Sequence, residues 1–361
     1  MFIADLRQPR TMIFWGAVGA ALCSLRAWAK RHGADPFLLV ASCCYWETQV
    51  SFQPDVQTSV DYRRRHSRKW AVLNGHDSSM TSVEHESPLG RWGIVLRRVH
   101  PALSGIITQL WHGAGRVAYK RDRILPRAQS YLLINLGPPQ YMVLRGEPEI
   151  RVAFDDIWFS GISDIPIDTE APHGNVLLGV AFTACGAASL LGLPQYEIAN
   201  RTGSFADLFG RAAFDLRDRL LEFSDAASRL QLAEEWLLSN CVSGRHIHPL
   251  VAWATRRLAE SGGKLRTAEL ARDAGCSRKH IAGLFRDRVG LAPKTLARIH
   301  RFQNALVCIS ADHQVDWSEL ATHCGYYDQA HLIHDFRQFA GLAPTEFVRC
   351  ARPDAGSVVL R

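Results

Sequence analysis

The chain has 361 residues, 47% of them hydrophobic, and its 42 lysines and arginines against 35 aspartates and glutamates give a formal charge of +7. This length predicts two to three domains, and the hydrophobic content excludes a wholly disordered chain. The nine cysteines include no C-x-x-C pair, which excludes a disulfide framework and is typical of reduced thiols in the cytoplasm.

Residues 1–80 show no sustained hydrophobic period. The apolar run from Thr11 to Leu25 resembles a secretory leader, but Arg26 interrupts the region where cleavage would occur. The run is also shorter than the roughly 20 residues that a membrane-spanning helix needs, so we expect no membrane association. We expect the native chain to begin at Met80, which would make residues 1–79 either an over-extended reading frame or a disordered extension.

Residues 81–205 contain short apolar segments separated by turn signals. Tyr131–Leu136 and Tyr141–Leu144, for example, flank Gly137-Pro138-Pro139, and such alternation predicts strands joined by turns. We therefore expect a mainly β sensor domain, built as a small barrel or a sandwich. Five side chains are candidates for lining a pocket, although each fits an ordinary core or loop position better: Trp111, His112, Trp158, His173 and Phe182.

Residues 206–245 are expected to form a helical linker. Apolar residues recur there at a spacing of three and four, at Leu216, Leu220, Phe223, Ala227, Leu230 and Leu237. Glu234 interrupts this seam. Two interpretations are open: a helix that dimerises through the seam, or an amphipathic helix that packs on its own sensor domain.

Residues 246–351 contain one pattern twice. The first copy consists of Glu269-Leu270-Ala271, Gly275, Phe285-Arg286 and Gly290-Leu291-Ala292-Pro293, and the second of Glu319-Leu320-Ala321, Gly325, Phe336-Arg337 and Gly341-Leu342-Ala343-Pro344. The offset is 50 residues before the inner turn and 51 after it, so the second turn carries one extra residue. A repeated helix, glycine turn and helix predicts two helix-turn-helix units, at about residues 265–289 and 316–340.

Each unit has a residue that can cap its second helix, Ser277 in the first and Asp328 in the second. Between the units, apolar residues at helical spacing from Pro293 to Ser310 predict a connecting helix. A helix of sixteen residues spans about 24 Å, and consecutive major grooves are roughly 34 Å apart. With the flanking helices added, both second helices would reach consecutive major grooves.

Residues 249–351 resemble the C-terminal DNA-binding domain of the AraC/XylS family of bacterial transcription regulators. The second copy is similar to the signature region of that family through Trp317-Ser318-Glu319-Leu320-Ala321, Cys324-Gly325-Tyr326, His331-Leu332, Phe336-Arg337, Phe339 and Gly341-Leu342-Ala343-Pro344. The resemblance implies an all-α double helix-turn-helix domain after a sensor domain that is often a cupin-like barrel. The expected fold class is therefore α+β multidomain, with a mainly β domain first.

In that family, outward positions of both recognition helices contact bases, and by position these are Lys279, Gly283, Ala330 and His334. Residues 245–352 carry sixteen basic and ten acidic side chains, which suits an electrostatic grip on phosphates. The candidate DNA contacts are Arg278, Lys279, His280 and Arg286 in the first unit, and Gln329, Ala330, His331, His334 and Arg337 in the second.

These features predict a sequence-specific transcription regulator whose sensor domain binds a small effector and so alters promoter affinity. Candidate partners are double-stranded promoter DNA, a small-molecule effector, RNA polymerase and a second copy of the chain. No catalytic residue, cofactor or metal is expected, because the sequence has no Gly-rich phosphate loop, G-x-S-x-G motif or metal-ligand set. The alternatives are an enzyme fused to an AraC-type domain, such as a DNA alkylation-repair methyltransferase with a reactive cysteine, and a ligand-independent DNA binder. Residues 352–361 are expected to be a tail.

Overall fold

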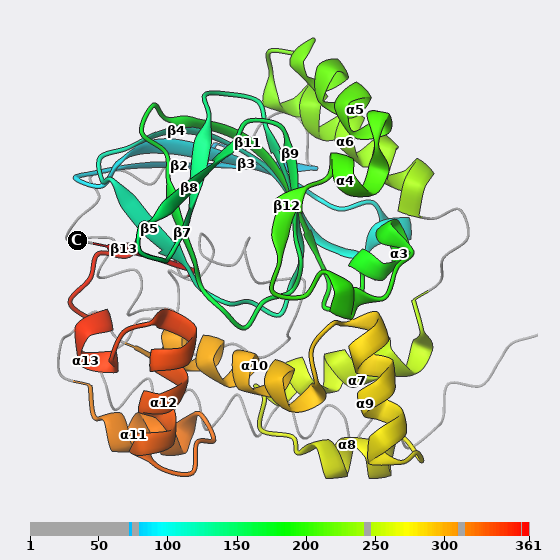
Figure 1. The fold of residues 1–361 in the computed structure, drawn as a ribbon, viewed down its shortest axis with the longest axis vertical. Coiled ribbons are helices and arrows are strands. Elements are labelled where there is room, and N and C mark those ends of the chain that lie inside the picture. The colour runs from blue at the N-terminus through cyan, green and yellow to red at the C-terminus, as the bar shows by residue number, and fades with distance from the viewer. Residues whose placement is uncertain (1–71, 74–78, 242–246, 310–314, 355, 361) are drawn as a thin grey trace, which may run out of the picture.

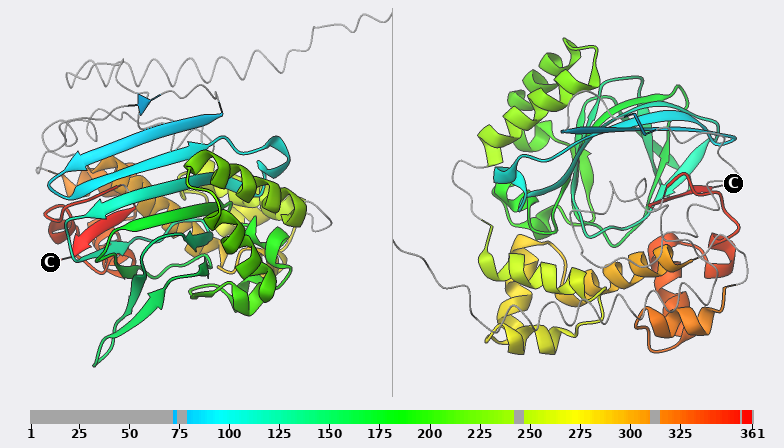
Figure 2. Two further views of the ribbon diagram at one scale, coloured as in Figure 1. Left: turned by 90° about the horizontal axis from the view of Figure 1, so that it is seen from above. Right: turned by 180° about the vertical axis from the view of Figure 1, so that it is seen from behind.

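The computed structural model describes residues 72–73, 79–241, 247–309, 315–354 and 356–360. They form a β-sheet domain of two antiparallel sheets and a helical region that lies along one side of it (Figures 1 and 2). A mainly β domain followed by a helical region is the α+β arrangement that the sequence predicts.

The first sheet has eight strands in the order β1-β2-β3-β4-β11-β6-β9-β12. All neighbouring strands of this sheet are antiparallel. The longest registers are those of the pairs β2–β3, β3–β4 and β4–β11. The bounds are β1 Val72–Leu73, β2 Met80–Ser87, β3 Gly90–Arg97, β4 Ile107–Val117, β6 Tyr131–Asn135, β9 Ile157–Ser160, β11 Asn175–Phe182 and β12 Thr202–Ser204.

The second sheet has five strands in the order β13-β5-β10-β7-β8, with bounds β5 Arg121–Ile124, β7 Gln140–Leu144, β8 Ile150–Phe154, β10 Ile167–Glu170 and β13 Ser357–Leu360. Strand β13 lies within the last ten residues, for which the sequence predicts a tail. It pairs antiparallel with β5, and Val358 is fully buried. The tail is a strand because β5 offers it an edge of unpaired backbone groups, which no local sequence pattern reports.

Short helices cover one face of the first sheet. They are the 3-10 turns η2 (Pro101–Leu103) and η3 (Gln195–Glu197) and the helices α3 (Ala187–Leu191), α4 (Ala206–Phe209), α5 (Arg211–Leu221) and α6 (Ala226–Cys241). The seam leucines Leu216, Leu220, Leu230 and Leu237 are buried in one core with Phe182 of β11. Glu234, which interrupts the seam, forms an ion pair with Arg97 of β3 at 2.9 Å. The four leucines of the seam thus pack on their own domain, whereas Phe223 and Ala227 of the same seam are exposed.

The five side chains considered for a pocket do not converge. Phe182 and His112 are buried on the helix-covered side, where His112 Nε2 lies 3.2 Å from Nη1 of Arg229. Burial, and then the Arg229 charge, lowers the pKa of His112 to about 4. Trp111 lies on the opposite side, where a Cβ atom at Gly179 would overlap its ring, while His173 is exposed and Trp158 packs on Phe154.

The buried carboxyl group of Asp122 in β5 makes the free energy of unfolding depend on pH. Burial raises its pKa to about 6, although Thr169 donates a hydrogen bond to its carboxylate at 2.6 Å. The pKa of Asp122 is higher in the folded state than in the unfolded state. The contribution of its carboxyl group to stability is therefore fully present below pH 4 and is lost as pH rises through 6. Asp122→Asn should therefore raise the free energy of unfolding at pH 7 by about 1–2 kcal/mol, with the gain disappearing near pH 4. Urea unfolding across this range measures it; the exposed Asp155→Asn is the control, and an equal gain at both pH values would contradict the prediction.

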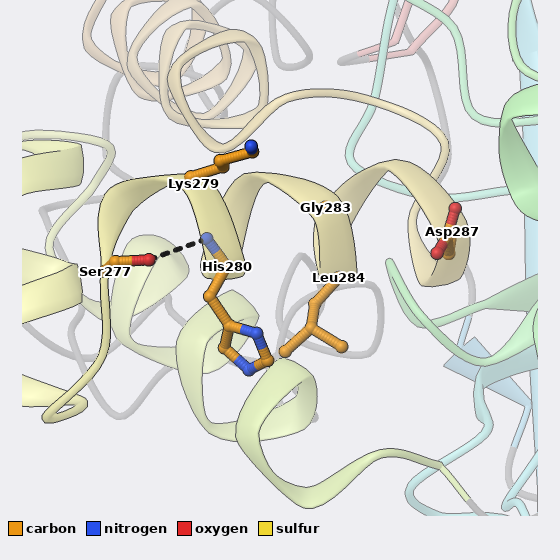
Figure 3. Close-up of a pocket in the computed structure, with 6 residues that line it drawn as sticks. All are labelled: Ser277, Lys279, His280, Gly283, Leu284 and Asp287. Atoms are coloured by element: carbon orange, nitrogen blue, oxygen red, sulfur yellow. Dashed lines mark hydrogen bonds between the residues drawn. The ribbon is translucent and has the colours of Figure 1, made fainter.

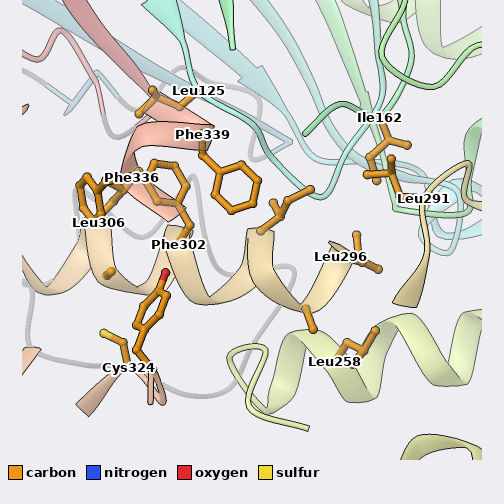
Figure 4. Packing of buried hydrophobic residues seen from close by; sticks show 14 of the residues in the cluster. Leu125, Ile162, Leu258, Leu291, Leu296, Phe302, Leu306, Cys324, Phe336 and Phe339 are labelled. Atoms are coloured by element: carbon orange, nitrogen blue, oxygen red, sulfur yellow. The ribbon is translucent and has the colours of Figure 1, made fainter. Parts of the chain in front are cut away.

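The helical region has seven helices within the described residues, and three Phe side chains lie at its centre. The bounds are α7 Pro249–Glu260, α8 Thr267–Asp273, α9 Arg278–Arg288, α10 Pro293–Cys308, α11 Trp317–His323, α12 Gln329–Ala340 and α13 Pro344–Phe347. Phe302 of α10 faces Phe336 and Phe339 of α12, with ring centroids 5.1 and 5.3 Å apart (Figure 4). Leu125 and Ile162 of the β-sheet domain belong to the same core, so the two parts of the chain share buried surface.

The turn after α7 brings the backbone close to α10. Gly263 has φ +76°, and a Cβ atom there would overlap the carbonyl oxygen of Ala297 and lie 2.8 Å from the backbone nitrogen of Arg301. Only glycine adopts this conformation without strain and leaves room for the neighbouring helix. The turn at Gly263 therefore holds the C-terminal end of α7 against α10.

No helix in the described ranges is both long and apolar enough to cross a membrane. The apolar run from Thr11 to Leu25 lies outside the described residues. Of residues 1–79, only strand β1 and Ser79 are described, and β1 pairs with β2.

Candidate nucleic-acid interface

The first helix-turn-helix unit consists of α8 and α9, joined by a turn at Gly275 with φ +62°. The Ser277 hydroxyl accepts a hydrogen bond from the backbone N–H of His280 at 3.1 Å and so caps α9. Ile281 and Phe285 are fully buried, which fixes the inner face of this helix. The cap and the inner face agree with the sequence prediction, and they leave the first turn of α9 pointing outward.

Arg278, Lys279 and His280 are exposed in that first turn. Lys279 and His280 border an open hollow of about 480 Å³, which Ser277, Gly283, Leu284 and Asp287 also line (Figure 3). A Cβ atom at Gly283 would meet nothing within 4 Å. The glycine therefore leaves the middle of α9 open on its outer side, although it supplies no side chain for reading a base.

Arg286 lies apart from these three residues. Its guanidinium lies over the ring of Tyr196 in η3, 4.2 Å from the centroid. The turn after α9 contacts the same segment, since a Cβ atom at Gly290 would lie 2.7 Å from the carbonyl oxygen of Gln195. The C-terminal end of α9 thus rests on the β-sheet domain, and the structure does not group Arg286 with Arg278, Lys279 and His280.

The second unit consists of α11 and α12. Asp316 caps α11 by accepting from the backbone N–H groups of Ser318 and Glu319, and Asp328 caps α12 by accepting from that of His331 at 2.7 Å. A buried ion pair fixes α12 on the connecting helix: Arg298 of α10 contacts Asp335, which has no exposed surface, at 2.5 Å. This ion pair anchors the second helix of this unit on α10.

Gln329, Ala330, His334 and Arg337 are exposed along the outer side of α12, as the sequence predicts. His331 is half-buried instead, with its ring perpendicular to that of Tyr326 at 5.3 Å. Burial lowers the pKa of His331, so its imidazole is biased toward the neutral form. We conclude that His331 helps to pack the turn of the second unit and is less available for an outside partner than the other four.

One exposed side chain in this region was missed at the sequence level. Tyr327 is 93% exposed, whereas its neighbour Tyr326 is 5% exposed. Ser277, which caps α9, follows Gly275 by two positions, whereas Asp328, which caps α12, follows Gly325 by three. Tyr327 is thus the extra residue of the second turn. The change of the repeat offset from 50 to 51 is the signal that could have found it.

A family model described as a helix-turn-helix domain matches residues 270–349, which span both units from α8 to α13. Residues 270–349 are an AraC-type helix-turn-helix domain. The match confirms the family resemblance stated for this part of the chain. Within the described residues, no group of three or more His, Cys, Asp or Glu side chains could hold a metal ion.

The solved structures that this chain resembles are distant and cover part of it. ToxT from Vibrio cholerae O395 is 11% identical, with a TM-score of 0.37 over 64% of this chain and 93% of that one. The AraC-like transcriptional activator CuxR is 13% identical, with a TM-score of 0.19 over 70% of this chain and 92% of that one. These TM-scores lie below 0.5, and we infer nothing from them. No curated protein matches the chain.

Proposed function

We propose that the chain is a sequence-specific transcription regulator whose helices α9 and α12 enter successive major grooves of promoter DNA. The observation that carries the proposal is the duplicated unit, with exposed polar first turns on α9 and α12 and with α10 between them (Figure 1). Lys and Arg side chains at such positions can contact phosphates and the edges of guanine, and Gln those of adenine. The excess of basic residues in this region supports the same function.

Contacts between the two parts of the chain support a regulatory role for the β-sheet domain. Gln303 of α10 donates to the carbonyl oxygen of Pro126 at 2.6 Å, and Gln338 of α12 donates to Asp164 at 3.4 Å. A ligand that moves the β-sheet domain would therefore move α10 and α12, and so change how the two recognition helices are placed relative to each other. We propose a small-molecule effector, RNA polymerase and a second copy of the chain as further partners, and the cytoplasm as the location.

The experiment that tests the main proposal is an unbiased selection from random DNA duplexes with the full chain. We expect enrichment of a motif with two half-sites about 10 base pairs apart, because that spacing places both on one side of the duplex. Binding to it should weaken steeply with salt, by about one log-log unit per phosphate neutralised. Recovery of no motif would reject the function.

Four of the cysteines that the structure describes give little support to a fused alkyl-transfer enzyme. Burial raises the pKa of Cys185, and it raises that of Cys241 to about 12, so both thiols stay protonated. A hydrogen bond with Cys324 lowers the pKa of Cys308, but both residues belong to the core of the helical region. A ligand-independent DNA binder is the other alternative, and a selected duplex bound equally under all effector conditions would favour it.

Lys279→Ala and His334→Ala should each weaken binding to the selected duplex by about 1–3 kcal/mol, because each removes a side chain from the outer face of a recognition helix. Competition against random duplex distinguishes contacts to bases from contacts to phosphates. A loss confined to the selected site means base reading, whereas an equal loss on random DNA would reassign the residue to phosphate contact. Arg272→Ala, an exposed change in α8, is the matched control.

Tyr327→Ala should weaken binding to the selected duplex by about 1 kcal/mol, roughly fivefold in Kd, without changing thermal stability. The side chain is almost fully exposed at the start of α12, where a hydroxyl can donate to a phosphate. Tyr327→Phe separates the hydroxyl from the ring. An unchanged Kd for the alanine variant would exclude the contact.

A further inference from the structure

The outer side of α9 has no side chain at its middle. Ile281 and Phe285 are fully buried, and Gly283 lies two residues from each of them, on the opposite face of the helix. A Cβ atom at Gly283 would meet nothing within 4 Å, and the hollow around it has a volume of about 480 Å³. The helix thus has a gap at the place where a side chain would otherwise meet the edge of a base.

The two ends of this hollow carry opposite charges. Lys279 borders it one turn before Gly283, and Asp287 borders it one turn after. Both side chains are exposed, and neither forms an ion pair within the described part of the chain. Eight residues of an α-helix span about 12 Å, or roughly three to four base-pair steps. The two charges are therefore far enough apart to meet different base pairs, with Gly283 between them.

Leu284 gives the hollow an apolar wall. It is half-buried and packs against the core of the helical region, so its side chain is held in place. His280 lies beside it on the same side of the helix, and Lys279 projects on the other side (Figure 3). Ser277, the sixth lining residue, already accepts from the backbone N–H of His280. The middle of the hollow is therefore lined by the bare backbone of Gly283 and by a leucine.

The corresponding position of the second unit is filled. Gly283 is the sixth residue after the N-cap of α9, and the sixth residue after the N-cap of α12 is His334, which is exposed. By the same count, Lys279 of α9 corresponds to Ala330 of α12. The two helices thus present different outer surfaces, and we expect their half-sites to differ in sequence.

We propose that the hollow at Gly283 receives the 5-methyl group of a thymine, which makes Gly283 a specificity-determining residue of the first unit. This inference rests on the proposed regulator function. The thymine methyl is the apolar group that the major groove of unmodified DNA offers, so it matches a bare stretch of helix beside a leucine. Its burial against Leu284 favours thymine over a base without the methyl group.

The charged ends of the hollow set the direction of the half-site. Lys279 can donate to guanine O6 or N7 at one end, and Asp287 can accept from the amino group of cytosine or adenine at the other. The Asp287 carboxylate also repels a phosphate, which keeps that end over base edges. We therefore expect the thymine between a guanine and a base pair that offers an amino group to Asp287.

Replacement of thymine by deoxyuridine in the selected duplex removes this methyl group alone. For the full chain, we expect the Kd to rise about three- to fivefold at one thymine of the α9 half-site, as for the loss of one buried methyl group. At that position, 5-methylcytosine should bind more tightly than cytosine by a similar factor. A motif without a thymine in this half-site, or an unchanged Kd when each thymine is replaced in turn, overturns the proposal.

Gly283→Leu tests whether the methyl group contacts this position. The added side chain fills the hollow, so the variant should bind the thymine duplex about tenfold more weakly, as for a mismatched base pair, and should no longer distinguish thymine from uracil. The site is open and lies within a helix, so the variant should fold, which thermal unfolding checks. Ala212→Leu adds the same side chain at an exposed position of α5 and should keep the preference for thymine. An undiminished preference in Gly283→Leu would assign the methyl contact to another residue and overturn the proposal.

The inference and the proposed function fail in different ways. Recovery of no preferred duplex rejects the regulator function and this inference with it. A preferred duplex that responds neither to uracil nor to Gly283→Leu keeps the regulator function and rejects the thymine site alone.

Discussion

Arg298→Ala is expected to lower the free energy of unfolding by about 3–5 kcal/mol, because it strands a buried carboxylate. Asp335 has no exposed surface, and Arg298 contacts it through both Nε and Nη2 while Nη2 also donates to Gln338 at 2.6 Å. Loss of the arginine leaves the unpaired negative charge of Asp335 in the core between α10 and α12. Urea unfolding at pH 7 measures the change.

The control for Arg298→Ala removes both charges together. In the double variant Arg298→Met with Asp335→Leu, apolar side chains of similar size replace the pair, and most of the lost stability should return. Arg211→Ala, which breaks an exposed pair in α5, should change stability little. A cost for Arg298→Ala no larger than that of Arg211→Ala would show that the buried pair does not position α12.

Gly263→Ala is expected to lower the free energy of unfolding by at least about 3 kcal/mol. The added methyl group would overlap the backbone of α10 at Ala297, and the left-handed conformation, with φ +76°, is itself unfavourable for alanine. The change should also impair DNA binding at temperatures where the variant stays folded, since α10 sets the separation of the two units. Thermal unfolding and duplex binding measure these two effects.

Gly283→Ala is the matched control, because it makes the same substitution at an open site. Gly283 lies within α9, a Cβ atom there would meet nothing within 4 Å, and its φ is not in the left-handed region. Alanine is the better helix former, so stability should rise by roughly 0.5–1 kcal/mol. Equal effects of the two substitutions would mean that the tight approach at Gly263 is not a constraint.

The repeat is the part of the fold that the sequence predicts in most detail. The caps Ser277 and Asp328 and the buried positions Ile281, Phe285 and Phe336 follow from local spacing, which is why both units could be placed. The same locality explains the outward direction of Lys279 and His334, since a side chain opposite the buried face of a helix has to point away from the core. The function of these residues stays a prediction.

Contacts between distant segments could not be predicted. No sequence pattern near Arg286 predicts that its guanidinium lies over the ring of Tyr196, ninety residues earlier in the chain. Helical spacing likewise shows that Leu216 and Leu220 share a face, but it does not say whether that face meets the first sheet or a second chain. Pairing across long separations depends on shape and on which surfaces remain uncovered, and a single sequence without relatives records neither.

The strand β13 has a practical consequence for studying chains that are shortened at the C-terminal end. A chain cut at residue 352 lacks the strand that covers the edge of β5, and it also loses Val358 from the core that the helical region shares with the β-sheet domain. The exposed edge would invite association between copies. DNA affinities measured on such a shortened chain would therefore describe recognition helices that have lost one of their attachments to the β-sheet domain.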